Sequence, residues 1–262
     1  MGKGLKKYFT ITAGRTGSAW LTSFLSSNLN INAVHEPLGI DDFGVNMPDI
    51  RTMRSFNNYG NNDFVKEFWK RKFSNLPHTT YAETNHTLCK CGLVENLLLN
   101  KLEGEAILIV LKRNIIKQCV SYIVRHDFGN ITLAWQWYLH PAYRKKIVNP
   151  EPFMKLGGIG VPLWYCYEML ARQEYYVQKF SNKVSMHQVT LEELTSNTGA
   201  QDFHNLLGLH GKCVVPSPKN ENKAKPSEQL VRQVSDIVDK INLDMPQLVE
   251  GTIKKGFSFD VV

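Results

Sequence analysis

Six consecutive apolar residues at positions 106–111 constrain the fold of this chain more than any other segment. Charged residues, Glu105 and Lys112, stand on both sides of the run, which is far shorter than the ~20 apolar residues that span a bilayer. The run is continuous and does not alternate with polar residues, which is typical of a strand buried on both faces of a parallel sheet. It therefore predicts a parallel sheet with helices on both sides.

Strand-like and helix-like segments alternate along the rest of the sequence. We expect strands at residues 8–13, 31–34, 79–82, 106–111 and 184–189. We expect helices at residues 18–29, 93–102, 114–124, 133–147, 163–180, 192–207 and 226–241. Such alternation favours an α/β fold with a mostly parallel sheet and right-handed crossovers. The 262 residues have the size of one domain, which we expect to cover residues 1–262.

The turn between the first expected strand and the first expected helix is suited to phosphate. Gly14 and Gly17 flank it, and unpaired N–H groups and the helix dipole attract anions at such a corner. Arg15, Thr16 and Ser18 add a cation and two hydroxyl groups. The turn is neither a Walker A loop nor a G-x-G-x-x-G loop, because no Lys-Ser or Lys-Thr pair follows and the glycine spacing differs. Taken alone, it is equally consistent with an ordinary turn in which Ser18 is the N-cap.

A second polar segment follows the buried run. Arg113 comes just beyond the strand at residues 106–111, where open α/β sheets bind ligands. Ser121 lies eight residues later, so the two side chains can share one anion only if the chain between them is partly irregular. The alternative is a solvated helix face, on which such a pair is common.

Taken together, the two segments resemble the family of sulfotransferases that use PAPS (3′-phosphoadenosine-5′-phosphosulfate), in particular its bacterial and Golgi-type members with an Arg in the first loop. Residues 14–21, GRTGSAWL, are similar to the family's first motif, P-[KR]-[ST]-G-[ST]-[ST]-[WL]-[LV]. Gly14 stands in place of the Pro, and Ala19 in place of a hydroxyl residue.

Two later segments extend this resemblance over residues 8 to about 210. Arg113, Asn114 and Ser121 are similar to the motif R-[DN]-P-x-[DE]-x3-S, although Ile115 replaces its Pro and Lys117 its acidic residue. Residues 191–194, LEEL, are similar to the family's Tyr-Glu-Asp-Leu.

The resemblance implies a P-loop-like parallel sheet flanked by helices, with additional helices in the acceptor-side region. It implies that one loop binds the 5′-phosphosulfate of PAPS through Arg15, Thr16, Gly17, Ser18, Ala19 and Trp20. Arg15 would also act in catalysis, by stabilising negative charge on the oxygen that bridges phosphorus and sulfur. Arg113 and Ser121 would bind the 3′-phosphate.

Sulfuryl transfer also needs a base for the acceptor, and the second expected strand leads into His35 and Glu36. In bacterial and Golgi-type members a Glu near this point removes the acceptor's proton, so we expect Glu36 to be the base and His35 to be the runner-up. Neighbouring residues on a strand point to opposite faces, so only one of the two lines the site unless the strand has ended. Glu83 and His86, after the third strand, are lesser candidates.

The charge balance favours an anionic partner. Lys and Arg outnumber Asp and Glu by 31 to 24, which gives a net charge of +7 and a pI near 9.1. The basic residues are dispersed and no nucleic-acid motif accompanies them, so we expect a polyanionic small molecule such as PAPS and no nucleic acid. Lys219 and Lys223, in the loop at residues 212–225, would touch PAPS or belong to a solvated basic loop.

The remaining patterns exclude other classes of site and give no indication of oligomeric state. The five cysteines have no spacing suited to zinc, and we expect reduced, mostly buried thiols and no required metal. With no membrane span and no signal peptide visible, we expect a cytoplasmic protein without a membrane partner.

We therefore predict sulfuryl transfer from PAPS to a hydroxyl or amine of a small-molecule acceptor, with a secondary metabolite among the candidates. The alternatives are a P-loop-type nucleotide kinase and a non-catalytic module that binds a nucleotide or polyanion.

Overall fold

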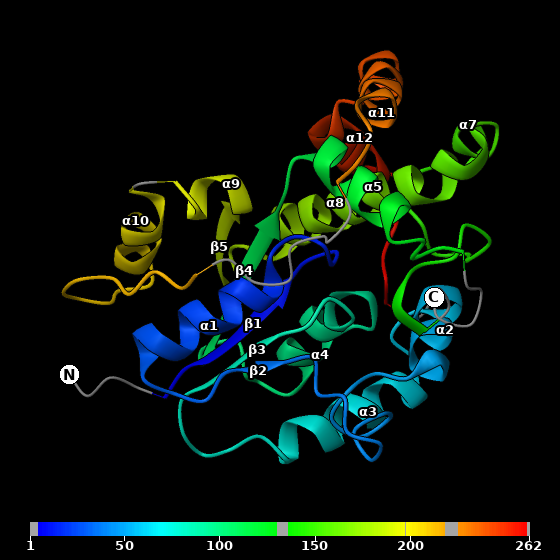
Figure 1. The fold of residues 1–262 in the computed structure, drawn as a ribbon. Helices are drawn as coiled ribbons and strands as arrows, with labels where there is room; N and C mark the ends of the chain where they lie inside the picture. The colour runs from blue at the N-terminus through cyan, green and yellow to red at the C-terminus, as the bar shows by residue number, and fades with distance from the viewer. Residues whose placement is uncertain (1–4, 130–135, 197, 218–224, 261–262) are drawn as a thin grey trace.

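Five parallel strands form one sheet in the computed structural model, which describes residues 5–129, 136–196, 198–217 and 225–260. The sheet order is β2-β3-β1-β4-β5 (Figure 1). The strands are β1 (Lys7–Ile11), β2 (Val34–His35), β3 (Tyr81–Thr84), β4 (Ala106–Lys112) and β5 (Ser185–Thr190). Each pairing between neighbours is parallel. The predicted α/β fold with a parallel sheet flanked by helices is confirmed.

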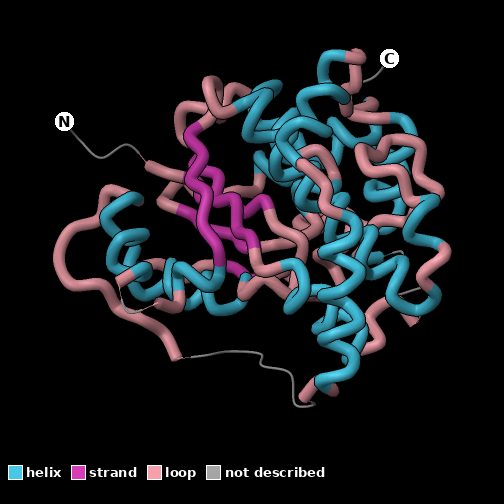
Figure 2. Tube along the Cα trace, turned by 90° about the horizontal axis from the view of Figure 1, so that it is seen from above, coloured by secondary structure: helices cyan, strands magenta, loops and turns pink. Residues whose placement is uncertain are grey.

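The buried run on β4 divides its side chains between two cores. Ile107 and Ile109 pack on the face covered by α1 (Ser18–Leu29), α9 (Leu191–Leu194) and α10 (Gly199–Leu206). Leu108 and Val110 pack on the opposite face. The helices of that second core include α4 (Leu93–Leu99), α5 (Ile115–Val124) and α8 (Gly160–Phe180). Figure 2 shows helices on both sides of the strands, as the continuous apolar run predicts.

Further helices are added to this frame. They are α2 (Ile50–Tyr59), α3 (Asp63–Ser74), η1 (Leu88–Lys90), α7 (Glu151–Met154), η2 (Gly157–Ile159), α11 (Glu228–Ile241) and α12 (Met245–Lys254). The sequence analysis missed α2, α3 and α12. Each of the three begins after a polar N-cap, Asp49, Asn62 or Asp244, whose side chain accepts a backbone N–H bond.

Several predicted boundaries are wrong. The helix expected at residues 192–207 is two helices, because Thr190 and Glu193 form a capping box for the short α9 and α10 begins separately at Gly199. The helix expected at residues 133–147 is absent over residues 138–147, which include the helix breaker Pro141. Part of that helix, residues 130–135, lies outside the described residues. The second and third strands begin two or three residues later than expected.

All five cysteines lie in the described part of the chain, and each is buried with a free thiol, as expected. In the same part of the chain no helix has the length and apolar character to cross a membrane. Among the described residues, His, Cys, Asp and Glu side chains form no group of three or more that could hold a metal ion.

Candidate functional site

A cavity of about 1510 Å³ opens where the strands end. Residues that follow each of the five strands line it: Gly14 after β1, Glu36 after β2, His86 after β3, Arg113 after β4 and Leu191 after β5. Open parallel sheets bind their ligands at this edge. The topology therefore brings together segments that are far apart in the sequence.

The loop between β1 and α1 is tightly wound and leaves helix N–H groups available to a ligand. Gly14, Arg15 and Gly17 all have a positive φ, of 72°, 55° and 88°. A Cβ on Gly17 would lie 2.5 Å from Leu191 Cδ1, and a φ of 88° strains any residue with a side chain, so this position favours glycine. Gly17 is the N-cap of the twelve-residue α1, and it has no side chain to bond to the N–H groups of the first turn. Those groups and the helix dipole make this corner suited to an anion.

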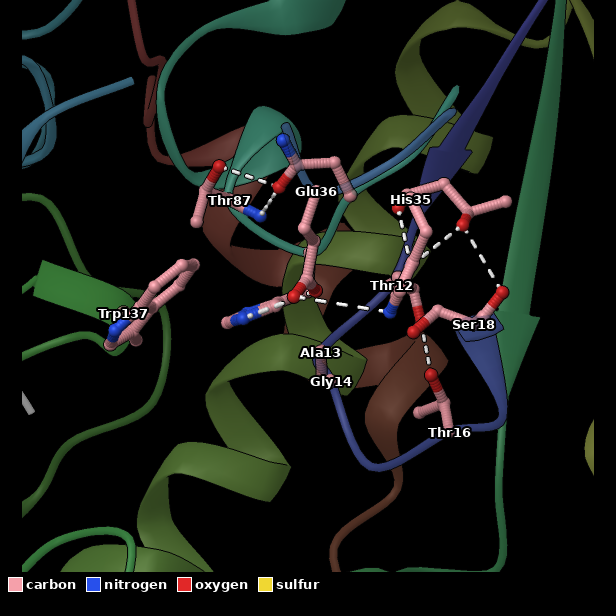
Figure 3. Close-up of polar contacts among 12 residues, drawn as sticks. Thr12, Ala13, Gly14, Thr16, Ser18, His35, Glu36, Thr87 and Trp137 are labelled. Carbon is pink, nitrogen blue, oxygen red and sulfur yellow. Dashed lines mark hydrogen bonds and ion pairs between the residues drawn. The ribbon is translucent and has the colours of Figure 1, made fainter. Parts of the chain in front are cut away.

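Most residues of the predicted 5′-phosphosulfate loop line the cavity. They are Arg15, Gly17, Ser18, Ala19 and Trp20. The side chain of Thr16 is instead buried, and its hydroxyl shares a 2.5 Å hydrogen bond with Thr12 (Figure 3). Ser18 is the first residue of α1, so the alternative in which it serves as N-cap is wrong.

Polar side chains of helix α5 hold this loop in place. Gln118 donates a 2.8 Å hydrogen bond to the carbonyl oxygen of Gly14. Tyr122 donates to the same oxygen at 2.8 Å and to the Ala13 carbonyl at 2.5 Å. Both side chains are buried, which fixes the loop against α5.

The predicted pair of Arg113 and Ser121 meets at Arg15. Nη1 of Arg113 donates to the backbone oxygen of Arg15 at 2.7 Å, and Nε of Arg15 donates to Ser121 Oγ at 3.1 Å. Both members of the pair line the cavity, because Arg113 precedes the N-cap of α5 and is not part of the regular helix. The two motifs therefore form one polar cluster.

The positive charges of Arg15 and Arg113 in this cluster are only partly offset by nearby carboxylates. Burial lowers the pKa of Arg113, and burial together with nearby Arg125 lowers that of Arg15. The buried Nε of Arg113 has no hydrogen-bond partner among the described residues. Such an orphaned donor is costly unless a ligand satisfies it.

The wider cavity has a surplus of cations over anions. Its charged lining comprises Arg15, Arg113, Lys117, Arg125 and Lys225 against Glu36, Asp127 and Glu192. Lys219 and Lys223 lie outside the described residues. The described lining is therefore suited to a polyanion.

The predicted base, Glu36, stands where β2 ends. Strand β2 stops at His35, and Glu36 has a φ of 45°, which is uncommon for a residue other than glycine. Because the strand has ended, the side chains of His35 and Glu36 need not point to opposite faces, and both line the cavity. Figure 3 shows the Glu36 carboxylate directed toward His35, with Trp137 on the other side in this view.

Two histidines flank this carboxylate. Oε1 of Glu36 lies 3.6 Å from Nε2 of His86, and Oε2 lies 4.0 Å from Nε2 of His35. Burial raises the pKa of Glu36, and the charges of His35 and Lys90 oppose that increase. A carboxylate with a raised pKa near neighbouring imidazoles is suited to accepting a proton.

The lesser candidate Glu83 has a different role. It is fully buried, does not line the cavity, and accepts hydrogen bonds from Lys72, Tyr81 and Asn85. The sequence analysis missed Lys90, a fully buried lysine beside His86. Its position between two cysteines gives no signal that distinguishes it from a surface lysine.

The comparisons with known proteins give little further guidance. No family model and no curated protein match the sequence. Five chains among the solved structures match, and one is the crystal structure of a sulfotransferase from Alicyclobacillus acidocaldarius. That chain is 14% identical to this one, the match covers 95% of this chain and 96% of that chain, and the TM-score is 0.49. At this identity and TM-score, the likeness supports no inference about this chain.

Proposed function

We propose that this protein transfers a sulfuryl group from PAPS to a hydroxyl or amine of a small-molecule acceptor. One observation carries the proposal: a helix N-terminus with two arginines and the partly buried carboxylate of Glu36 line the same cavity. The motif resemblance supplies the identity of the anion, and the geometry is compatible with it.

The residues of the cavity fit a donor that carries one phosphate group on the 5′ position and another on the 3′ position of its ribose. The N–H groups at the start of α1 and the guanidinium of Arg15 would bind the 5′-phosphosulfate. Arg113 and Ser121 would bind the 3′-phosphate, and the orphaned Nε of Arg113 would gain an acceptor there. The indole of Trp20 lines the same region and donates to the carbonyl of Pro216 at 3.0 Å.

PAPS supplies a sulfuryl group attached to a phosphate leaving group. In the proposed step the acceptor oxygen or nitrogen forms a bond to sulfur while the bond from sulfur to the phosphate oxygen breaks. Glu36 takes the acceptor's proton, and Arg15 stabilises the negative charge that the departing oxygen gains. The electron pair of the broken bond stays with the product, 3′-phosphoadenosine-5′-phosphate (PAP).

Binding of PAP tests the donor half of the proposal. We expect PAP to raise the melting temperature without Mg²⁺, and Arg113→Ala to weaken PAP binding in calorimetry by ten- to a hundredfold, or roughly 1.5–3 kcal/mol. Lys112→Ala is the matched control, because this neighbouring cation bonds to Gln188 outside the cavity and should leave the affinity unchanged. Equal PAP affinity in the wild type and in a folded Arg113→Ala variant would exclude Arg113 from the site.

Turnover assays test whether the protein transfers the sulfuryl group to an acceptor. Labelled PAPS with a panel of phenols, sugars, alcohols and amines should yield a sulfated product. A thermal response to ATP that requires Mg²⁺, with none to PAP, would favour the kinase alternative. Tight PAP binding with no labelled product from any acceptor would favour a non-catalytic nucleotide-binding module.

A further inference from the structure

Lys90 is enclosed in a cage of hydrogen-bond acceptors directly behind the candidate base. Its ammonium donates to Nδ1 of His86 at 2.8 Å, to the hydroxyl of Tyr165 at 2.9 Å and to the carbonyl oxygen of Trp137. The hydroxyl of Tyr165 lies 3.4 Å from the Ala13 carbonyl, so its own proton is directed away from Lys90. An ammonium has three N–H groups and no lone pair, and here all three are used.

This cage fixes the tautomer of His86. Since Nδ1 accepts from the ammonium, a neutral His86 carries its proton on Nε2. That Nε2–H group faces Oε1 of Glu36 at 3.6 Å. The separation is longer than a direct hydrogen bond, and catalytic contacts of this kind commonly tighten when substrate binds.

His35 has the opposite tautomer. Its Nδ1 lies 3.1 Å from both the carbonyl oxygen and the hydroxyl of Thr84. The carbonyl can only accept, and the hydroxyl donates its proton to the Ser18 carbonyl, so Nδ1 is the donor. The Nε2 of a neutral His35 is therefore bare, and it faces Oε2 of Glu36 at 4.0 Å. Two acceptors that face each other favour a proton donor between them, which is the place for the acceptor's hydroxyl group.

We propose that Lys90 and His86 are positioning residues for the base: the ammonium holds His86 as an Nε2–H donor, which anchors Oε1 of Glu36 and leaves Oε2 to take the acceptor's proton. This inference rests on the proposed function, because it uses the acceptor's proton. Neither Lys90 nor His86 gains or loses a proton in the step.

The charged surroundings of Glu36 support this arrangement. It faces His35 on β2, His86 after β3, Lys90 on η1 and Arg15 after β1. Burial lowers the pKa of Lys90 to about 7, while its charge and that of Arg15 act to lower the pKa of Glu36. Burial and the Lys90 charge hold the pKa of His86 well below its usual value, so His86 stays neutral. Above about pH 7 Lys90 gains a lone pair, and Nδ1 of His86 is then free to carry the proton.

Lys90→Met tests the inference, with Lys72→Met as the matched control. Lys72 is a second buried lysine, and it pairs with Glu83 away from the cavity. We expect Lys90→Met to move the acid limb of the pH profile of kcat/KM to higher pH, because Glu36 loses a stabilising charge. We also expect kcat to fall by up to about a hundredfold, with unchanged PAP affinity. Lys72→Met should lower stability and leave the pH profile in place.

Nitrogen NMR of the histidine rings gives a readout that does not depend on turnover. Near pH 6 the wild type should show His86 protonated at Nε2, and Lys90→Met should give His86 a mixture of tautomers. A wild-type His86 protonated at Nδ1, or a Lys90→Met variant with the wild-type spectrum and pH profile, would overturn the inference.

Failure of the proposed function would give a different result, namely no PAP binding or no sulfated product. The histidine tautomers remain measurable in that case, so the two failures can be told apart. Should Lys90→Met not fold, His86→Phe keeps an aromatic ring beside Trp137 and Tyr138 and removes both nitrogens. Glu36 then keeps the Lys90 charge but loses the Nε2–H donor at Oε1, so the acid limb should move in the same direction by a smaller amount. An unshifted limb in this variant would equally overturn the inference.

Discussion

Substitution of Gly17 measures how tightly the anion-binding loop is built. In Gly17→Ala the new Cβ would lie 2.5 Å from Cδ1 of Leu191, and the residue would have to keep a φ of 88°. A left-handed backbone costs an L-residue about 1–2 kcal/mol. The Leu191 side chain is partly exposed and can rotate into the cavity, so overpacking adds only about 1 kcal/mol. We expect the free energy of unfolding to fall by the sum, about 2–3 kcal/mol.

Gly256→Ala separates the two contributions. Gly256 has a φ of 86°, and among the described atoms none lies within 4 Å of its added Cβ. It should therefore cost only the backbone component, about 1–2 kcal/mol. The difference between the two variants measures the contact with Leu191.

Urea denaturation gives the unfolding free energies, and calorimetry gives the PAP affinities. Gly17→Ala should weaken PAP binding at least tenfold, since Gly17 and the displaced Leu191 side chain both line the cavity, whereas Gly256→Ala should bind PAP as the wild type does. Adding Leu191→Ala should recover part of the stability and affinity that Gly17→Ala loses. If both glycine variants lose the same stability and keep the same PAP affinity, the tight approach of the loop to α9 is refuted.

Two further substitutions test the carboxyl groups of Glu36 and Glu95. Glu36→Gln should lower kcat by about 10²–10⁴-fold at unchanged PAP affinity. His35→Asn should lower kcat less, because its ring does not receive the proton first. An active Glu36→Gln variant beside an inactive His35→Asn variant would reverse these roles. Burial raises the pKa of Glu95 to about 7 and its Oε1 has no hydrogen-bond partner in the described structure, so the folded state binds the extra proton between the ordinary value of 4.5 and about 7. The unfolding free energy should therefore fall by ~3 kcal/mol as pH rises through that window. Urea titrations at pH 4.5 and 8 measure this loss, and Glu95→Gln should remove it. An equal loss in both proteins would contradict the assignment.

The sequence predicts the helices whose apolar residues have clear spacing. Trp20, Leu21, Phe24 and Leu25 are buried at helical intervals, and α1 begins and ends where the pattern does. In α3 the buried Val65, Phe68 and Trp69 have similar spacing, but the charged residues between them hide it. The predicted helix at residues 133–147 rested on aromatic residues, which fit many backbone conformations.

The site is predictable only as far as local motifs carry it. Arg15 and Arg113 follow strand ends in recognisable patterns, and both lie at the cavity. That Glu36 and His35 both line the cavity depends on a left-handed residue at the end of β2, which the sequence does not reveal. The role of Lys90 depends on acceptors from distant segments, and no local pattern contains them.

The sheet order also determines when the anion-binding corner can form during synthesis. Strand β1 lies between β3 and β4, and the bond from Arg15 to Ser121 spans 106 residues. While the ribosome is still making the chain before α5, the loop at Gly14 has neither Gln118 nor Tyr122 to hold it. Contacts between such distant segments form slowly, since long loops must close first. The proposed donor could therefore bind only late in folding, and only to chains in which the two halves of the sheet have already joined.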